Sequence, residues 1–399
     1  MDKSEMKLWI NQLRDELDDI VRFWSESMPD HKNGGFLAGI NTVGKVDDSG
    51  PKGVVLNARI LWSFSSLSIH HNPDCRMWAD RAYQYINEYF KDPVHSGYYW
   101  SVSQNGVPVS TKKQTYAQAF VLYALVEYYN LTHNFQALNE ACKLFFLIEE
   151  YGYNEEYGGY IEAGTRNWKV PDDWRLSSKD LNEPMSLNTH LHVLEAYTSL
   201  FSVFPDPSVK SAIEKLQQLF ASHFFRADGH LNLFFNRKWE PVGQLISYGH
   251  EIETTWLLRK SLDFVSYAPI IGDIAQWIDQ ALHTFLREAI LPDGSVRYES
   301  DPATGLDDRD RHWWVQAESM IALLDYHMHQ PEDQLLQSAH QIWQFIRNSL
   351  KDPRTGEWYW RLDSDGHWFS GDSLAGFWKC PYHNTRTCLE SIDRLKMLL

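Results

Sequence analysis

One loop signature recurs six times along the 399 residues and limits the folds that the chain can adopt. Each copy is a glycine turn that leads into a short aromatic stretch, which predicts a small hairpin. The three clearest copies read DHKNGGFLAGI, DPVHSGYYWSV and NEEYGGYIEAG, and the weaker ones read RADGHLNLFF, LPDGSVRYES and DPRTGEWYWRL. The glycines, Gly35, Gly97, Gly159, Gly229, Gly294 and Gly356, lie 62 to 70 residues apart, a period too long for the common solenoid repeats.

Two helical segments separate each loop from the next. The first is apolar and starts near Val54, Gln114, Ser186, His250, Trp313 and Tyr382. The second is more amphipathic and covers residues 5–24, 76–91, 136–151, 208–223, 271–289 and 334–349. Twelve helices in six pairs predict an all-α fold of two concentric rings, with the apolar set inside. Because no Ser-, Gly- or Pro-rich linker interrupts this pattern, we expect residues 1–399 to form a single domain.

The formal net charge of −16 argues against nucleic acid or an anionic membrane as a partner, because both attract positively charged surfaces. Charged residues interrupt the first 24 residues throughout, so we expect neither a signal peptide nor a membrane span there. We therefore expect a cytoplasmic protein. The chain contains 17 Trp, 20 Tyr and 20 Phe. Aromatic side chains of this number fit a site that stacks on pyranose rings, although an aromatic core is the alternative.

Polar and aromatic side chains stand out near the start of each apolar segment. They are Arg59, Tyr116, Asn188, His190, His192, His250, Glu253, Trp313, Trp314, Gln316, Glu318, Trp378 and His383. In a closed barrel the starts of the inner helices converge at one end, so we expect these residues to form one cluster. Helix N-termini carry partial positive charge, which stabilises developing negative charge and disfavours protonation of nearby imidazoles.

Spacing along a helix indicates which of these side chains lie on the same face. Asn188 and His192 are four apart and share a helix face, whereas His190 points away. The two histidines are therefore poorly placed to chelate together, and we expect one of them to be structural. His250 and Glu253 are three apart, so Glu253 is placed to orient the imidazole. A purely structural hydrogen bond is the alternative for that pair.

Three further expectations concern single positions. Arg59 on an apolar helix needs a partner, which favours a ligand-facing side chain. Of Trp313 and Trp314, we expect only one to reach a cavity. His383 follows a proline and is expected in a loop before the last helix.

A metal site is an alternative explanation for the histidines. His192, His250, Glu253 and His383 are of the types that bind zinc or non-haem iron. Their spacing on separate helices leaves that alternative open.

The chain resembles the N-acylglucosamine 2-epimerase family and, within it, the enzymes that invert C2 at the reducing end of β-1,4-linked disaccharides such as cellobiose. The matching blocks are NARILWSFS, YAQAFVLYALVEYY, MSLNTHLHVLEAYT, GHEIETTWLL, RHWWVQAESM and FWKCPYHNTRTCLE, in this order along nearly the whole chain. The resemblance implies an (α/α)6 barrel, a neutral disaccharide substrate, no metal and no organic cofactor. It also favours a monomer.

The resemblance also implies roles for individual residues. His250 and His383 match the acid/base pair, Glu253 the glutamate that supports His250, and His192 a histidine that assists ring opening or positions the substrate. Arg59 matches the arginine that polarises substrate oxygens. Asn188, Tyr116, Trp313 and Trp378 are assigned to substrate binding, with the tryptophans stacking on the sugar rings.

These assignments favour reversible epimerisation at C2 of cellobiose, lactose or mannobiose through ring opening and an enediolate. Aldose–ketose isomerisation shares that intermediate and is one alternative. An inverting glycoside hydrolase is a second, and Glu253 and Glu318 are the carboxylates available for it. A non-catalytic sugar-binding or protein-binding module is a third.

Overall fold

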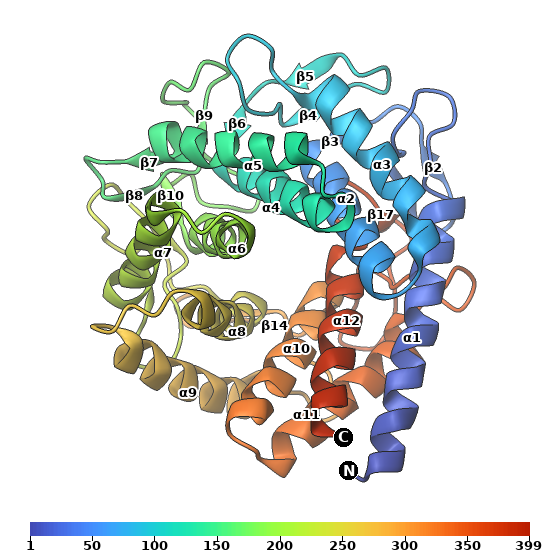
Figure 1. Cartoon of the computed structure of the whole chain (residues 1–399). Helices are drawn as coiled ribbons and strands as arrows, with labels where there is room; N and C mark the ends of the chain where they lie inside the picture. The colour runs from blue at the N-terminus through green and yellow to red at the C-terminus, as the bar shows by residue number, and fades with distance from the viewer.

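The computed structural model describes residues 1–399 and shows two concentric rings of six α-helices each (Figure 1). The inner ring consists of α2 (Val54–His70), α4 (Thr115–Thr132), α6 (Leu187–Val203), α8 (Tyr248–Phe264), α10 (Trp313–His329) and α12 (Tyr382–Leu398). The outer ring consists of α1 (Lys3–Glu26), α3 (Arg76–Tyr85), α5 (Phe135–Leu147), α7 (Pro207–Leu219), α9 (Ile271–Glu288) and α11 (Asp333–Phe345). The predicted (α/α)6 barrel is therefore confirmed, and every inner helix begins within two residues of its predicted start.

Burial explains why the two sets of helices differ in sequence. Inner helices contact a neighbour on each side and an outer helix behind them, and α12 closes the ring by packing on both α10 and α2. In α4, all residues from Thr115 to Val126 are buried, so the helix is apolar around its whole circumference. Outer helices bury one face only, which gives them their amphipathic pattern. None of the helices combines the length and the apolar composition that a membrane crossing needs.

Four outer helices end in a wider turn than the sequence pattern could predict. A five-residue π-helical turn extends α3, α5, α7 and α11, at Ile86–Phe90, Ile148–Gly152, Phe220–Phe224 and Ile346–Leu350. A single 3-10 turn, Pro73–Cys75, precedes α3.

The six repeated loops form six small antiparallel hairpins, as their glycine and aromatic pattern predicts. The paired residues are Pro29 with Phe36, Lys91 with Tyr98, Tyr153 with Tyr160, Phe225 with Leu231, Ile290 with Val296, and Lys351 with Trp358. A glycine with positive φ lies in each turn, for example Gly97 at 67° and Gly356 at 81°. In the third loop this residue is Gly158 rather than the predicted Gly159.

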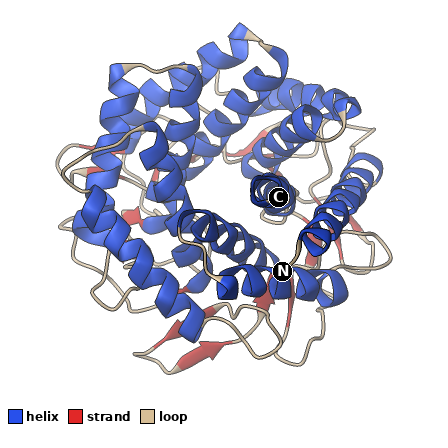
Figure 2. Cartoon of the chain, turned by 60° about the horizontal axis from the view of Figure 1, so that its bottom comes forward, coloured by secondary structure: helices blue, strands red, loops and turns tan.

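Short strands in the connections pair each connection with the next around the rings, and Figure 2 shows these strands in red. Three sheets have three strands each: β17 (Ser373–Ala375), β1 (Gly39–Asn41) and β2 (Val46–Asp47); β3 (Lys52–Gly53), β4 (Ser101–Val102) and β5 (Pro108–Ser110); β12 (Ile246–Ser247), β13 (Glu299–Asp301) and β14 (Leu306–Asp308). Four sheets are pairs: β6 (Lys113–Gln114) with β9 (Ala163–Gly164), β7 (Tyr153–Asn154) with β8 (Gly159–Tyr160), β10 (Met185–Ser186) with β11 (Phe234–Phe235), and β15 (Arg311–His312) with β16 (Arg361–Leu362). Because β17 of the last connection pairs with β1 of the first, the strands close the ring as the helices do.

A buried carboxylate ties the two ends of the chain together. Glu357, which is 0% exposed, accepts hydrogen bonds from the indole of Trp24 on α1 at 2.5 Å and from the amide of Asn384 on α12 at 2.6 Å. It also pairs with the fully buried ammonium of Lys379 at 2.7 Å. The first helix, the last hairpin and the last helix therefore depend on one side chain.

Replacing Glu357 by alanine should lower the free energy of unfolding by about 3–5 kcal/mol, because Lys379 would remain buried without its counter-charge. Chemical denaturation followed by circular dichroism measures this change. Glu156→Ala, at an exposed position, is the control and should change stability by no more than about 0.5 kcal/mol. Equal stability of the two variants would show that Glu357 does not hold the ends together.

Candidate active site

A cavity of about 300 Å³ opens where the starts of the inner helices converge, and it contains all nine residues predicted for the site. These are Arg59, Tyr116, Asn188, His192, His250, Glu253, Trp313, Trp378 and His383. Nine other residues complete its wall: Leu176, Ser177, Ser178, Lys179, Asp180, Tyr298, His312, Trp314 and Trp360. The size and the mixed aromatic and polar lining suit a small polyhydroxylated molecule.

Three histidines of the cavity wall are each held by their Nδ1 atom. His192 Nδ1 lies 2.9 Å from Glu195 Oε2, His250 Nδ1 lies 2.8 Å from Ser247 Oγ, and His383 Nδ1 lies 2.7 Å from Glu318 Oε1. A ring fixed through Nδ1 can offer only Nε2 to a ligand. All three rings therefore present the same nitrogen to the cavity.

Burial keeps these imidazoles neutral. Loss of hydration lowers the pKa of His250 to about 3 and lowers the pKa of His192. Burial, reinforced by the nearby guanidinium groups of Arg59 and Arg386, lowers the pKa of His383 well below its usual value. At neutral pH each ring is therefore uncharged and available as a base.

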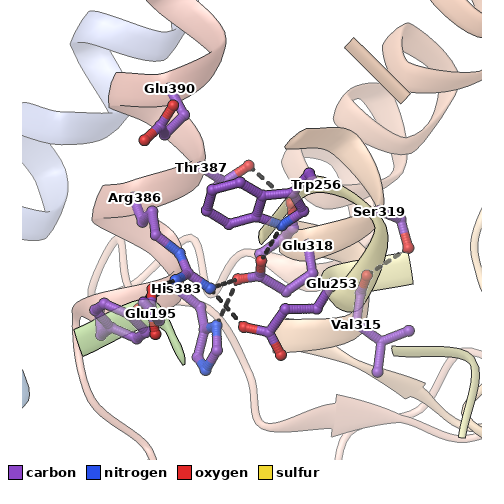
Figure 3. A network of polar contacts seen from close by, with 12 residues as sticks. Glu195, Glu253, Trp256, Val315, Glu318, Ser319, His383, Arg386, Thr387 and Glu390 are labelled. Atoms are coloured by element: carbon purple, nitrogen blue, oxygen red, sulfur yellow. Dashed lines mark hydrogen bonds and ion pairs between the residues drawn. The ribbon is translucent and has the colours of Figure 1, made fainter. Parts of the chain in front are cut away.

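Arg386, in the second turn of α12, links three buried carboxylates (Figure 3). Its Nη2 atom donates to Glu253 Oε1 at 2.6 Å and pairs with Glu318 Oε1 at 2.7 Å, while Nη1 pairs with Glu195 Oε1. The partner carboxylates come from α6, α8 and α10, so one guanidinium contacts four inner helices. Burial alone would raise the pKa of Glu195, but the charge of Arg386 and the bond to His192 lower it to about 2.

The partner of Glu253 differs from the sequence-based expectation. Glu253 hydrogen-bonds Arg386, and Ser247 is the residue bonded to His250. The expectation rested on spacing within one helix. The N-cap residue of α8 lies as close to His250 in sequence as Glu253 does, and it binds the ring instead.

Arg59 and the tryptophans also line the cavity. Arg59 donates to Tyr116 Oη at 2.7 Å and lies over the ring of Phe120, while its Nε has no partner. Trp313 and Trp314 both line the cavity, so the expectation that only one would do so was wrong. The start of α10 explains this, because Trp313 is its first residue and both indoles extend from the rim.

The structure also shows where His190 and His383 lie. His190 points away from the cavity: its Nδ1 donates to the Ser186 carbonyl at 2.7 Å, and its Nε2 accepts from the Tyr160 amide at 3.0 Å. One of the two histidines is therefore structural, as predicted, and it is His190. His383 lies in the first turn of α12 and not in a loop, because Pro381 occupies the N-cap position of that helix.

Sequence reasoning missed the loop residues Leu176–Asp180 and the pair Glu195 and Arg386. The loop has no periodic pattern that would have marked it. Glu195 is three residues after His192, a helical spacing that could have identified it as the partner of that ring. Arg386 had a local signal, because it is a charged residue on a helix whose neighbours are buried.

The donor set does not fit a metal ion. Glu253, Glu318 and His383 bring ligand atoms within 4.8 Å of one another, but Arg386 binds both carboxylates and fills the position between them. The Nδ1 atoms of His192 and His383 are bonded to carboxylates. Because Arg386 already binds these carboxylates, the residues leave no free ligand set for the metal alternative.

The chain matches the N-acylglucosamine 2-epimerase (GlcNAc 2-epimerase) family model over residues 34–387. The chain belongs to this family. It is 38% identical to the cellobiose 2-epimerase of Bacteroides fragilis over 373 residues, which are 93% of this chain and 95% of that protein.

Solved structures agree with this placement. A cellobiose 2-epimerase from Bacillus thermoamylovorans B4167 superposes with a TM-score of 0.92 at 36% identity, covering 97% of this chain and all of that one. A D-mannose isomerase superposes with a TM-score of 0.82 at 20% identity over 96% of this chain and 97% of that one, and shows the shared fold alone.

His190 allows a test of how burial affects these rings, because it is 0% exposed and burial lowers its pKa to about 4. The unfolded chain binds this proton near pH 6.5, so stability is lost as the pH falls below 6.5. Between pH 7 and pH 5 this histidine should cost about 2 kcal/mol of unfolding free energy. His190→Asn should remove that part of the pH dependence, measured by urea denaturation at both values. The exposed His31→Asn control should retain it, and equal slopes for both variants would contradict the assignment.

Proposed function

We propose that this enzyme is a cellobiose 2-epimerase, which reversibly inverts C2 of the reducing-end sugar of a β-1,4-linked disaccharide. The observation that carries the proposal is the presence of neutral imidazoles from different helices, His250 on α8 and His383 on α12, in the wall of one cavity. Similarity to cellobiose 2-epimerases at 36–38% identity supports it. The ring closes from α1 to α12, which supports the further proposal that residues 1–399 act as one catalytic domain.

The chemistry requires a base that is unprotonated at neutral pH, in a site that excludes water. The C2 proton becomes acidic only when the ring opens and C1 is an aldehyde. Removal of that proton by one histidine gives an enediolate, and return of a proton to the other face by the second histidine inverts C2. Two rings from different helices can flank the carbon, whereas one ring reaches a single face.

The remaining cavity residues take supporting roles in this proposal. His192, with Nδ1 bound to the ionised Glu195, offers an unprotonated Nε2 that assists ring opening at the anomeric hydroxyl. Arg59, with an unpartnered Nε, and Asn188, with an unpartnered Oδ1, bind substrate oxygens as charge develops on them. Trp313 and Trp378 stack on the two sugar rings.

The hydrolase alternative finds less support in the geometry. It needs two carboxylic groups on opposite sides of a glycosidic bond. Of its two candidates, Glu253 lines the cavity, but Glu318 is 0% exposed and is engaged by Arg386, His383 and the indole of Trp256. Isomerisation of an aldose to a ketose differs from epimerisation only in the carbon of the enediolate to which the proton returns. A D-mannose isomerase shares the fold.

Incubation of the purified enzyme with cellobiose in D2O, followed by proton NMR, tests the proposal. We expect 4-O-β-glucosyl-mannose with deuterium at C2. Free glucose would contradict the proposal in favour of hydrolysis, and a ketose as main product would favour isomerisation.

His250→Asn and His383→Asn should each lower kcat about 10²–10⁴-fold, the usual contribution of a general acid or base. The exposed His31→Asn is the matched control and should keep the wild-type rate. The same NMR assay measures all three variants. A loss of less than tenfold in either cavity variant would remove that histidine from the acid/base pair.

A further inference from the structure

A two-base epimerisation needs a proton donor on one side of C2, yet both proposed histidines are neutral. One of them must lose a proton to the enediolate from its neutral ring, and an imidazole does so readily only if its other nitrogen gains a proton at the same time. The group next to Nδ1 of each ring therefore decides which ring can act as the acid. For His250 that group is the hydroxyl of Ser247, and for His383 it is the carboxyl of Glu318.

Glu318 belongs to a cluster of three buried carboxyl groups that share one cation. Its Oε1 atom and Oε1 of Glu253 bind the same Nη2 atom of Arg386, at 2.7 and 2.6 Å. Glu195 binds the other terminal nitrogen of the same guanidinium. Three fully buried carboxyls thus depend on one cation, and no other lysine or arginine pairs with any of them.

The helices packed around the three carboxyls and Arg386 supply no second counter-charge. The titratable and charged side chains that face this cluster are Glu195 and His192 from α6, Glu253 and His250 from α8, Glu318 from α10, Tyr382, His383 and Arg386 from α12, Arg59 from α2, and Tyr116 and Tyr123 from α4. Arg59 is engaged by the hydroxyl of Tyr116 and contacts no carboxylate. Three negative charges around one positive charge leave an excess of buried negative charge.

Uptake of one proton relieves this excess. Burial and the neighbouring charge of Glu318 raise the pKa of Glu253 to about 8, and burial raises the pKa of Glu318 as well. Glu195 stays ionised, because the charge of Arg386 offsets its burial and keeps its pKa low. The extra proton therefore belongs to the other two carboxyls.

We propose that Glu253 and Glu318 hold one proton between them at neutral pH, and that its position sets whether His383 is an acid or a base. With the proton on Glu318, that carboxyl donates to Nδ1 of His383, and Nε2–H points into the cavity. With the proton on Glu253, the Glu318 carboxylate accepts Nδ1–H, and the Nε2 lone pair points into the cavity. Glu318 is then a positioning residue for His383. Its part in turnover rests on the proposed function, whereas the shared proton does not.

The step balances without any other reactant. The C2–H bond breaks as its proton goes to His250. A new C2–H bond forms with the Nε2 proton of His383, while the carboxyl proton of Glu318 moves to Nδ1. After product release His250 gives up its proton to the cavity, and Nε2 of His383 takes one up from the cavity. Nδ1 then returns its proton to Glu318, so that the two carboxyls again hold one proton between them. No atom is oxidised or reduced within the enzyme.

Carbon-13 NMR of the full chain labelled at glutamate Cδ tests the shared proton without substrate. One signal should titrate as the pH rises through about 8, and Glu253→Gln and Glu318→Gln should each abolish this titration. Glu162→Gln is the matched control: that buried carboxyl, whose pKa burial raises to about 7, binds Ser186 and Thr189 and does not contact Arg386. It should lose a different signal and retain this one. A wild-type spectrum with both carboxyls ionised at pH 6 would overturn the proposal.

The pH dependence of kcat/KM for cellobiose tests the effect on His383. The wild-type value should fall above about pH 8, and Glu253→Gln should move this decline to lower pH by about one unit or more. A merely structural role would lower the rate equally at every pH, which would overturn the link to His383. A titrating signal in a protein that does not turn over any disaccharide would contradict the proposed function and leave the shared proton intact.

Discussion

The ion pairs of Arg386 with three buried carboxylates are the interaction on which the rest of the site depends. The guanidinium is completely enclosed by the inner ring and joins α12 to α6, α8 and α10. Without it, Glu195 and Glu318 would lose the charge that holds them, and His192 and His383 would lose the groups that orient them. One cation thus sets both the packing of four helices and the direction of two imidazoles.

The fold and the chemistry meet at the starts of the inner helices. A barrel of this kind buries its inner helices on all sides, and the residues of the candidate site lie where these helices begin and the cavity opens. The same burial that makes these helices apolar removes water from the histidines and keeps them neutral. A neutral imidazole is the form that can take a proton from carbon, so the enclosure keeps these rings in the state that the proposed activity needs.

Much of this arrangement could be predicted from the sequence because its signals are local. The glycine turns, the aromatic strands and the apolar stretch after Val54 each depend on neighbouring residues, and they gave the helix starts and the six hairpins. The partners of Arg386 could not be predicted, since Glu253 is 133 residues away in sequence and Glu195 is 191 residues away. The partner predicted for Glu253 was wrong for the same reason, because spacing within α8 gives no information about a cation on α12.

The central claim is that burial keeps three of the four histidines in the cavity wall neutral, with Nδ1 held by the protein and Nε2 facing the cavity. Nitrogen-15 NMR of the histidine-labelled enzyme at neutral pH measures this directly, because the two nitrogens of a neutral ring have widely separated shifts and those of an imidazolium do not. The account predicts neutral rings for His192, His250 and His383, with His192 protonated on Nδ1. Imidazolium signals from these three residues would contradict it, since a ring that is already protonated cannot accept the proton from C2.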